Sequence, residues 1–163
     1  MSTGQAVHAE VNMDVEASPY EVDAVRAAFR EAGVSATVAA ALERRGAETY
    51  PWAIFITVPI GLLLAGFLYA AGGDAYLAAK RLVTGLYAAR QNSKSPRGTV
   101  VMMDAESSEW VMLDQNLPDL AWQRLFETDI GKTKSAQLRW DPKTENWRDT
   151  FEIYKTPPDR GAT

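Results

Sequence analysis

Few residues in this 163-residue chain could carry chemistry, because the sequence has one histidine and no cysteine. The lack of cysteine excludes disulfides, thiolate metal sites and cysteine nucleophiles, and it fits a reducing compartment. A single histidine, His8, excludes metal sites that need a pair of histidine ligands. Since His8 falls on the polar side of an alternating segment, we interpret it as a surface residue rather than a catalytic base.

Four carboxylates gather in one short region, where they could be imagined as ligands of Mg²⁺. They are Asp104, Glu106, Glu109 and Asp114. Acidic residues at the ends of a hairpin are more often there for turn geometry and solubility. We therefore predict no metal site and no cofactor.

A second candidate motif is "GKTK" at 131–134, which has the form of the end of a phosphate-binding loop. The earlier glycine of that motif would stand at position 126, which is Phe126, and no strand leads into it. We interpret the segment as a polar loop before a strand. Nucleophile elbows, zincin motifs and glycine-rich dinucleotide loops are also missing from the sequence, so we predict that the protein is not an enzyme.

Basic and aromatic residues offer two possible binding surfaces. A stretch without acids between Asp74 and Asp104 carries Lys80, Arg81, Arg90, Lys94 and Arg97. It could meet an anionic lipid surface or an acidic partner, but we favour the interpretation that it is a solvated helix face and loop. In "WDPKTENW" (140–147), cross-strand packing of the two Trp residues explains the pattern better than a ligand platform does. A net charge of −4 gives no reason to expect nucleic acid as a partner.

The elements that would position these residues begin with a β-α-β unit over residues 6–42. Residues 7–17 alternate, with apolar side chains at odd positions and polar ones, from His8 to Glu16, at even positions. "SPYE" then predicts a helix start, with Ser18 as cap and Glu21 completing a capping box. Gly33 suits the left-handed end of that helix. A second alternating run, 34–42, predicts the returning strand.

The later elements follow from the same patterns. We predict an amphipathic helix at 74–90 with Asp74 as its cap, a loop at 91–98 and two hairpin strands at 99–104 and 109–114. Pro118 opens another helix, 135–140 alternates as a strand, and 147–154 is read as a final strand.

The stretch 50–83, "YPWAIFITVPIGLLLAGFLYAAGGDAYLAAKRLV", has two possible readings. Residues 52–72 are apolar and long enough for a membrane helix, which needs about 20 residues. Alternatively, Pro51 and Pro59 bracket a buried strand at 52–58, and an apolar helix follows it. Pro59 would interrupt one continuous helix at a cost of about 3 kcal/mol in water, so the second reading is favoured.

The order of parts resembles a known group of proteins. It is carried by "PWAIFITVPIGLLLAGF" running into "GGDAYLAAKRLVTGLYAAR", the "TVVMMD…EWVMLD" hairpin, "LPDLAWQRL" and "LRWDPKTENW". This layout, over residues 6–147, resembles small actinobacterial proteins and the effector-associated constant component family of bacterial conflict systems. The resemblance implies a small non-enzymatic partner, encoded beside proteases and NTPases. The apolar stretch is longer and more hydrophobic here, and no functional residue carries over.

The sequence thus predicts an α+β fold with a ferredoxin-like β-α-β start and one mixed sheet of about six strands, packed by two to three helices. One domain covers 1–155, with a buried strand and helix at 51–90, and 156–163 form a tail. The expected function is a non-enzymatic interaction or regulatory component, cytoplasmic, with protein partners, and the resemblance implies a role in a bacterial defence system. The alternative is a single-pass membrane protein spanning about 52–72 with a cytosolic C-terminal binding domain. The sequence does not define the oligomeric state.

Overall fold

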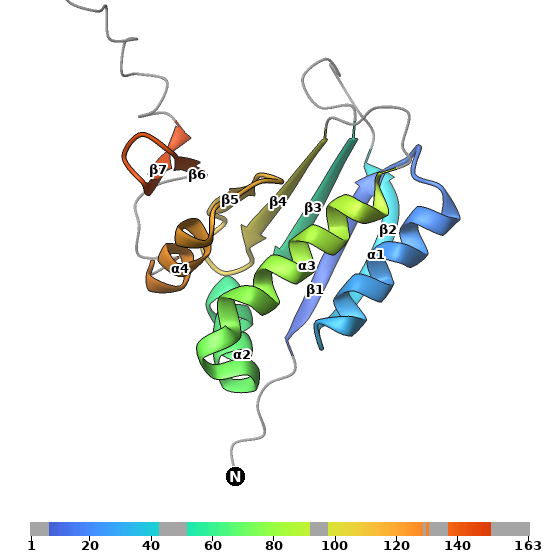
Figure 1. Cartoon of the computed structure of the whole chain (residues 1–163). Helices are drawn as coiled ribbons and strands as arrows, with labels where there is room; N and C mark the ends of the chain where they lie inside the picture. Colours follow the sequence, from blue (N-terminus) through green and yellow to red (C-terminus); the bar gives the residue numbers. More distant parts are fainter. Residues whose placement is uncertain (1–6, 43–51, 92–97, 129, 131–136, 151–163) are drawn as a thin grey trace, which may run out of the picture.

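A computed structural model describes residues 7–42, 52–91, 98–128, 130 and 137–150. Over these residues the chain forms one mixed sheet of seven strands and four α-helices (Figure 1). The predicted α+β fold with one mixed sheet is confirmed, and the sheet has one strand more than expected. The predicted tail at 156–163 lies outside the described residues.

The elements have the following bounds. The strands are β1 His8–Asp14, β2 Ser35–Leu42, β3 Trp52–Val58, β4 Gly98–Asp104, β5 Trp110–Leu113, β6 Gln137–Asp141 and β7 Asn146–Asp149. The helices are α1 Pro19–Glu31, α2 Ile60–Ala71, the 3₁₀ turn η1 Gly72–Asp74, α3 Ala75–Ala89 and α4 Asp119–Glu127.

The sheet is built from three β-α-β units placed side by side. Its order is β2-β1-β3-β4-β5-β6-β7. The pairs β1/β2, β3/β4 and β5/β6 are parallel, and helices connect the two strands of each pair. The antiparallel pairs β1/β3 and β4/β5 join neighbouring units, and the closing hairpin of β6 and β7 is also antiparallel. In Figure 1, α1 and α3 lie side by side over the same face of the sheet.

The first unit forms for the reasons that its sequence suggests. Ala9, Val11 and Met13 of β1 are buried in the core under the helices. The capping box of Ser18 and Glu21 is present, and Gly33 has a φ of 73°. Each of these predictions is confirmed.

Asp14 departs from the predicted pattern. The alternation assigns it to the wet face, but it is 1% exposed. The register of β1 against β2 shifts between Met13 and Asp14, so the alternation ends one residue early and the carboxylate turns inward.

The apolar stretch divides at Pro59. Residues Trp52–Val58 form β3, which pairs with β1 on one side and β4 on the other, and every second side chain is buried. Pro59 precedes α2, which ends at Gly72 with a φ of 56°, in the left-handed region that favours glycine. The chain then turns through η1, and α3 packs against α2. Asp74 stands at the N-cap of α3, but its side chain makes no capping hydrogen bond.

The C-terminal elements follow the predicted order. β4 and β5 form the expected hairpin, α4 begins after Pro118, and β6 begins at Gln137. The last strand is shorter than predicted, because β7 covers Asn146–Asp149 and Thr150 already has helical backbone. Residues 151–154 of the predicted strand lie outside the described part of the chain.

Candidate functional site

His8 lies on the exposed side of β1, as its place in the alternation predicts. Its ring nitrogens are 2.9 Å from the hydroxyl oxygens of Ser35 and Thr37 on β2, and the Glu10 carboxylate is 3.5 Å away. Apart from these two hydroxyls, no group capable of nucleophilic attack contacts the His8 ring within the described residues. His8 therefore serves as a surface link between two parallel strands.

The four carboxylates of the hairpin do not converge. Asp104 is buried at one end of β4, where it accepts hydrogen bonds from the backbone N–H of Ile60 at 3.1 Å and from the Ser107 hydroxyl at 2.6 Å. Asp114 follows Leu113, which pairs with Val100, four residues before Asp104 along β4 and thus about 13 Å of strand away. No group of three potential metal ligands occurs among the residues described here.

Asp104 has a structural task that the sequence did not reveal. The N-terminus of α2 has Pro59 at its cap position, and proline offers no capping side chain. Asp104 supplies the missing acceptor from a different strand, 44 residues further along the chain. A carboxylate at this position also interacts favourably with the helix dipole.

The basic stretch is dispersed by the fold. Lys80 pairs with Asp119 at 2.8 Å, whereas Arg81 is exposed. Arg90 is buried at the opposite end of α3. Lys94 and Arg97 lie outside the described residues, as does the "GKTK" segment at 131–134.

Trp140 and Trp147 pack against each other as a cross-strand pair, with ring centroids 5.7 Å apart. The indole N–H of Trp147 donates to the carbonyl of Ala121 on α4 at 2.9 Å. The turn between the two strands is held by Asp141. The hydrogen bond from Arg148 is the main cause that lowers the pKa of Asp141 below its usual value, and the backbone N–H of Lys143 lowers it further. The Trp140–Trp147 pair thus anchors the hairpin of β6 and β7, and cross-strand packing accounts for the motif at 140–147.

The most charged part of the core is an ion cluster at the C-terminal end of α3, which we call the Arg90 cluster: Arg90, Asp14, Glu21 and Trp52. One guanidinium nitrogen of Arg90 donates to both oxygens of Asp14, at 2.9 and 3.0 Å. The other terminal nitrogen is 2.6 Å from Glu21, close enough for an ion pair although not aligned for a hydrogen bond. The guanidinium also lies over the Trp52 ring, 5.5 Å from its centroid.

Trp52 fits beneath Arg90 because residue 98 is glycine. A Cβ atom on Gly98 would stand 2.0 Å from two ring atoms of Trp52, so the indole lies directly against the backbone of β4. The edge of the ring meets Tyr87, whose hydroxyl donates to the carbonyl of Leu113 at 2.6 Å. The indole is therefore packed on both faces and fixed in place.

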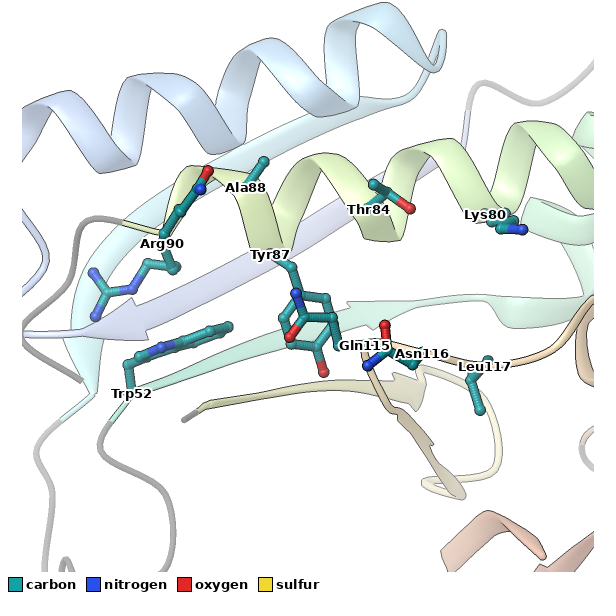
Figure 2. Close-up of a pocket in the computed structure, with 10 residues that line it drawn as sticks. Trp52, Lys80, Thr84, Tyr87, Ala88, Arg90, Gln115, Asn116 and Leu117 are labelled. Atoms are coloured by element: carbon teal, nitrogen blue, oxygen red, sulfur yellow. The ribbon is translucent and has the colours of Figure 1, made fainter. Parts of the chain in front are cut away.

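A groove of about 640 Å³ opens beside this cluster, between α3 and the segment that follows β5 (Figure 2). Its lining residues are Trp52, Lys80, Thr84, Tyr87, Ala88, Arg90, Gln91, Gln115, Asn116 and Leu117. The indole N–H of Trp52 and the Nε–H of Arg90 are buried and find no acceptor in the described structure. The lining holds amides, two hydroxyls, the Lys80 amine and these donors but no carboxylate or histidine, so it can form hydrogen bonds with a bound molecule.

The second surface of interest is the face of the sheet that no described helix covers. Its centre is apolar, and we call it the open-face patch: Phe55, Val101, Met103, Trp110 and Met112. The registers of β3, β4 and β5 place these side chains on one face, opposite to the helices. The Phe55 and Trp110 rings meet edge to face across β4, with centroids 5.8 Å apart. Val101 is buried although it lies outside the main core.

Polar residues border the open-face patch on both sides. On β1 the border is formed by His8, Glu10 and Asn12, and on the other side by Gln137 and Arg139 of β6. Arg139 pairs with Asp114 at 3.3 Å. The continuous apolar runs of β4 and β5 imply that both faces of these strands are apolar at their centre, but the sequence could not show which strands lie beside them.

Comparisons with protein-family models, with curated proteins and with solved structures found no match to this chain in any of the three.

Proposed function

We propose that this protein is a non-enzymatic interaction component that binds a protein partner through the open-face patch. The observation that carries the proposal is the apolar centre of a sheet face that no described helix covers. Antiparallel and mixed sheets commonly leave one face to solvent, but that face then carries mostly polar residues. Two aromatic rings and two Met side chains at its centre are the residue types that are enriched in protein interfaces.

The border of the patch supports a folded protein as the partner. Glu10 lies on one side and Arg139 on the other, so the rim carries both signs of charge. Nucleic acid would favour a basic rim, and an anionic bilayer would favour the same. A protein surface with an apolar centre and a polar, mixed-charge rim matches both parts of the patch.

The resemblance to the constant component family extends this proposal to a pathway. In that setting the chain is a regulatory partner of a protease or NTPase in a bacterial defence system and works in the cytoplasm. The groove beside the Arg90 cluster supports a binding role, because its lining offers several hydrogen-bonding groups.

Co-purification tests the proposal. The tagged chain is expressed together with a protease or NTPase encoded beside it, and we expect the two to elute as one complex. Trp110→Lys should abolish the complex, because a charge at the centre of an interface is desolvated without a partner. Tyr20→Lys is the matched control, since Tyr20 is exposed on α1 and away from the patch.

Met112→Lys provides a second patch variant in case Trp110→Lys lowers stability, and thermal melting identifies folded variants. Retention of the complex by folded patch variants would overturn the proposal. Turnover of any small substrate by the purified chain would contradict the non-enzymatic part.

The second candidate is the single-pass membrane protein expected from the apolar stretch at 52–72, with the C-terminal residues in the cytosol. Because Trp52–Val58 form β3, its crossing helix would have to lie after Pro59. Its support is one helical segment among the described residues, Ile60–Ala89, that is apolar and long enough to cross a membrane by length and composition. Cell fractionation separates the candidates: recovery in the soluble fraction without detergent favours the first, and a need for detergent favours the second.

A further inference from the structure

Helix α2 is apolar on all sides but buried on only one. Ile60, Leu63, Leu64 and Phe67 face the core. The remaining face, which we call the α2 outer face, is exposed and consists of Gly61, Leu62, Ala65, Gly66, Leu68, Tyr69 and Ala70. Helices that are apolar all round are normally buried entirely or placed in lipid, so this outer face needs a covering partner.

The exposure of the α2 outer face is large. Leu62 is 42%, Leu68 50% and Tyr69 96% exposed, which makes three of the five large apolar side chains that are exposed in the described structure. The exposed positions of α1 differ, because they include Asp23, Arg26 and other charged residues. In α2 no charge occurs between Pro59 and Gly73.

The chemistry of this face fits a lipid surface better than a protein. Tyr69 supplies the one side-chain hydrogen-bonding group of α2, so the helix offers little for the specific polar contacts that border protein interfaces. Exposed leucines beside a tyrosine suit the boundary of a bilayer, where the ring lies in the apolar layer and the hydroxyl meets the headgroups. Arg81, exposed on the second turn of α3, adds a cation near the same end of the sheet for anionic headgroups.

The geometry suits a helix that lies on a bilayer rather than one that crosses it. The 12 residues of α2 are about 18 Å long, shorter than the hydrocarbon layer of about 30 Å. The break at Gly72 prevents α2 and α3 from forming one straight rod. Figure 1 shows α2 at one end of the sheet, beside the N-terminal end of α3.

We propose that the α2 outer face docks this protein on the surface of a lipid bilayer as a peripheral protein, with Leu62, Leu68 and Tyr69 inserted at the headgroup boundary. This surface is separate from the open-face patch, so a protein partner and a bilayer can be bound together. The inference does not depend on the proposed function.

Vesicle flotation with the full chain tests the inference. The probes are vesicles of phosphatidylcholine alone and of phosphatidylcholine mixed with phosphatidylglycerol. We expect the wild-type protein to float with both and more strongly with the anionic mixture. The double variant Leu68→Ser/Tyr69→Ser should lower the bound fraction by about tenfold or more, since apolar burial drives interfacial binding.

The matched control is Val15→Ser/Tyr20→Ser, which removes two exposed apolar side chains of similar kind from the other end of the molecule. It should float like the wild type. Trp110→Lys should also float normally, so failure of the open-face proposal and failure of this one give different results.

Four outcomes would overturn the inference. The wild type could fail to float with either vesicle, or the control could lose binding as much as the α2 variant does. Retention in the membrane after a carbonate wash at high pH would instead indicate a spanning protein. If the α2 variant abolishes self-association in sedimentation velocity and leaves flotation unchanged, the outer face is an interface between copies of this chain.

Discussion

At one end of the sheet the core is closed by the Arg90 cluster, in which one guanidinium holds two carboxylates and covers an indole ring. At the other end it is closed by α2, a helix without a single charged residue. At the first end Arg90 and Asp14 are almost fully buried, at 3% and 1% exposure, beside a groove. The second end is buried on one side and open on the other.

The two ends differ in how much they contribute to the stability of the fold and in whether their side chains are available for binding. A buried ion pair costs desolvation energy and is held by hydrogen bonds, so removing one partner leaves an uncompensated charge in the core. Exposed apolar side chains contribute little to the free energy of folding, because they remain in contact with water in both the unfolded and the folded state. The charged end should therefore be sensitive to substitution, whereas the α2 outer face should tolerate it and remain available for binding.

Arg90→Met should have the largest effect. It leaves the Asp14 and Glu21 carboxylates buried without their cation, and we expect the free energy of unfolding to fall by about 3–5 kcal/mol. Urea denaturation followed by circular dichroism measures the change.

A triple variant sharpens this result. Asp14→Asn/Glu21→Gln/Arg90→Met removes all three charges and should recover much of the lost stability, because no buried charge remains unpaired. If it is as unstable as Arg90→Met, the cluster acts through packing rather than through charge.

Gly98→Ala should have the next largest effect. Its Cβ would meet the Trp52 ring at 2.0 Å, and the ring cannot move without disturbing Arg90 above it. Overpacking of this kind costs about 1–3 kcal/mol, and we expect the upper half of that range in the same unfolding experiment. Gly85→Ala is a milder control, because its Cβ would stand 3.2 Å from a side-chain atom of Ala28.

Asp104→Ala tests the apolar end, where this residue caps α2 from a distance. Loss of the acceptor for the Ile60 N–H should lower the free energy of unfolding by about 1–2 kcal/mol, as for other helix caps. Hydrogen exchange should show faster opening of α2 than of α3. Equal changes in both helices would mean that the carboxylate supports the hairpin alone.

The smallest change in stability is expected for Leu68→Ser/Tyr69→Ser. Because both side chains are exposed, the free energy of unfolding should stay within about 0.5 kcal/mol of the wild type. A loss above about 2 kcal/mol would show that these side chains contribute to the fold and would remove the contrast between the two ends.

The sequence predicted the elements of this fold because local periodicity reports which side of a segment is buried. It could not predict which charges are buried. Glu21 was expected as part of a capping box, and it forms that box, but it also meets Arg90 from 69 residues away. Arg90 was read as part of a solvated basic stretch, because nothing in its neighbourhood along the chain marks it as a core residue.

The same limit of prediction from sequence applies to the candidate binding surfaces. The short apolar runs 99–104 and 109–114 on either side of a turn predicted two hairpin strands, but the open-face patch depends on which strands are neighbours in the sheet. Similarly, Pro59 and the glycines divided the apolar stretch correctly into β3 and α2. They could not show that one side of α2 is left uncovered, since that depends on where α3 packs.

The order of strands has a consequence for how the chain is made. After β2, each new strand that the structure describes joins the same growing edge of the sheet, and none has to be inserted between two strands already present. A chain emerging from the ribosome can therefore extend the sheet in the order of translation. Arg90 can reach Asp14 and Glu21 only after α3 has been made, so the ion cluster adds to the earlier β1/β3 pairing a second link between the first unit and α3.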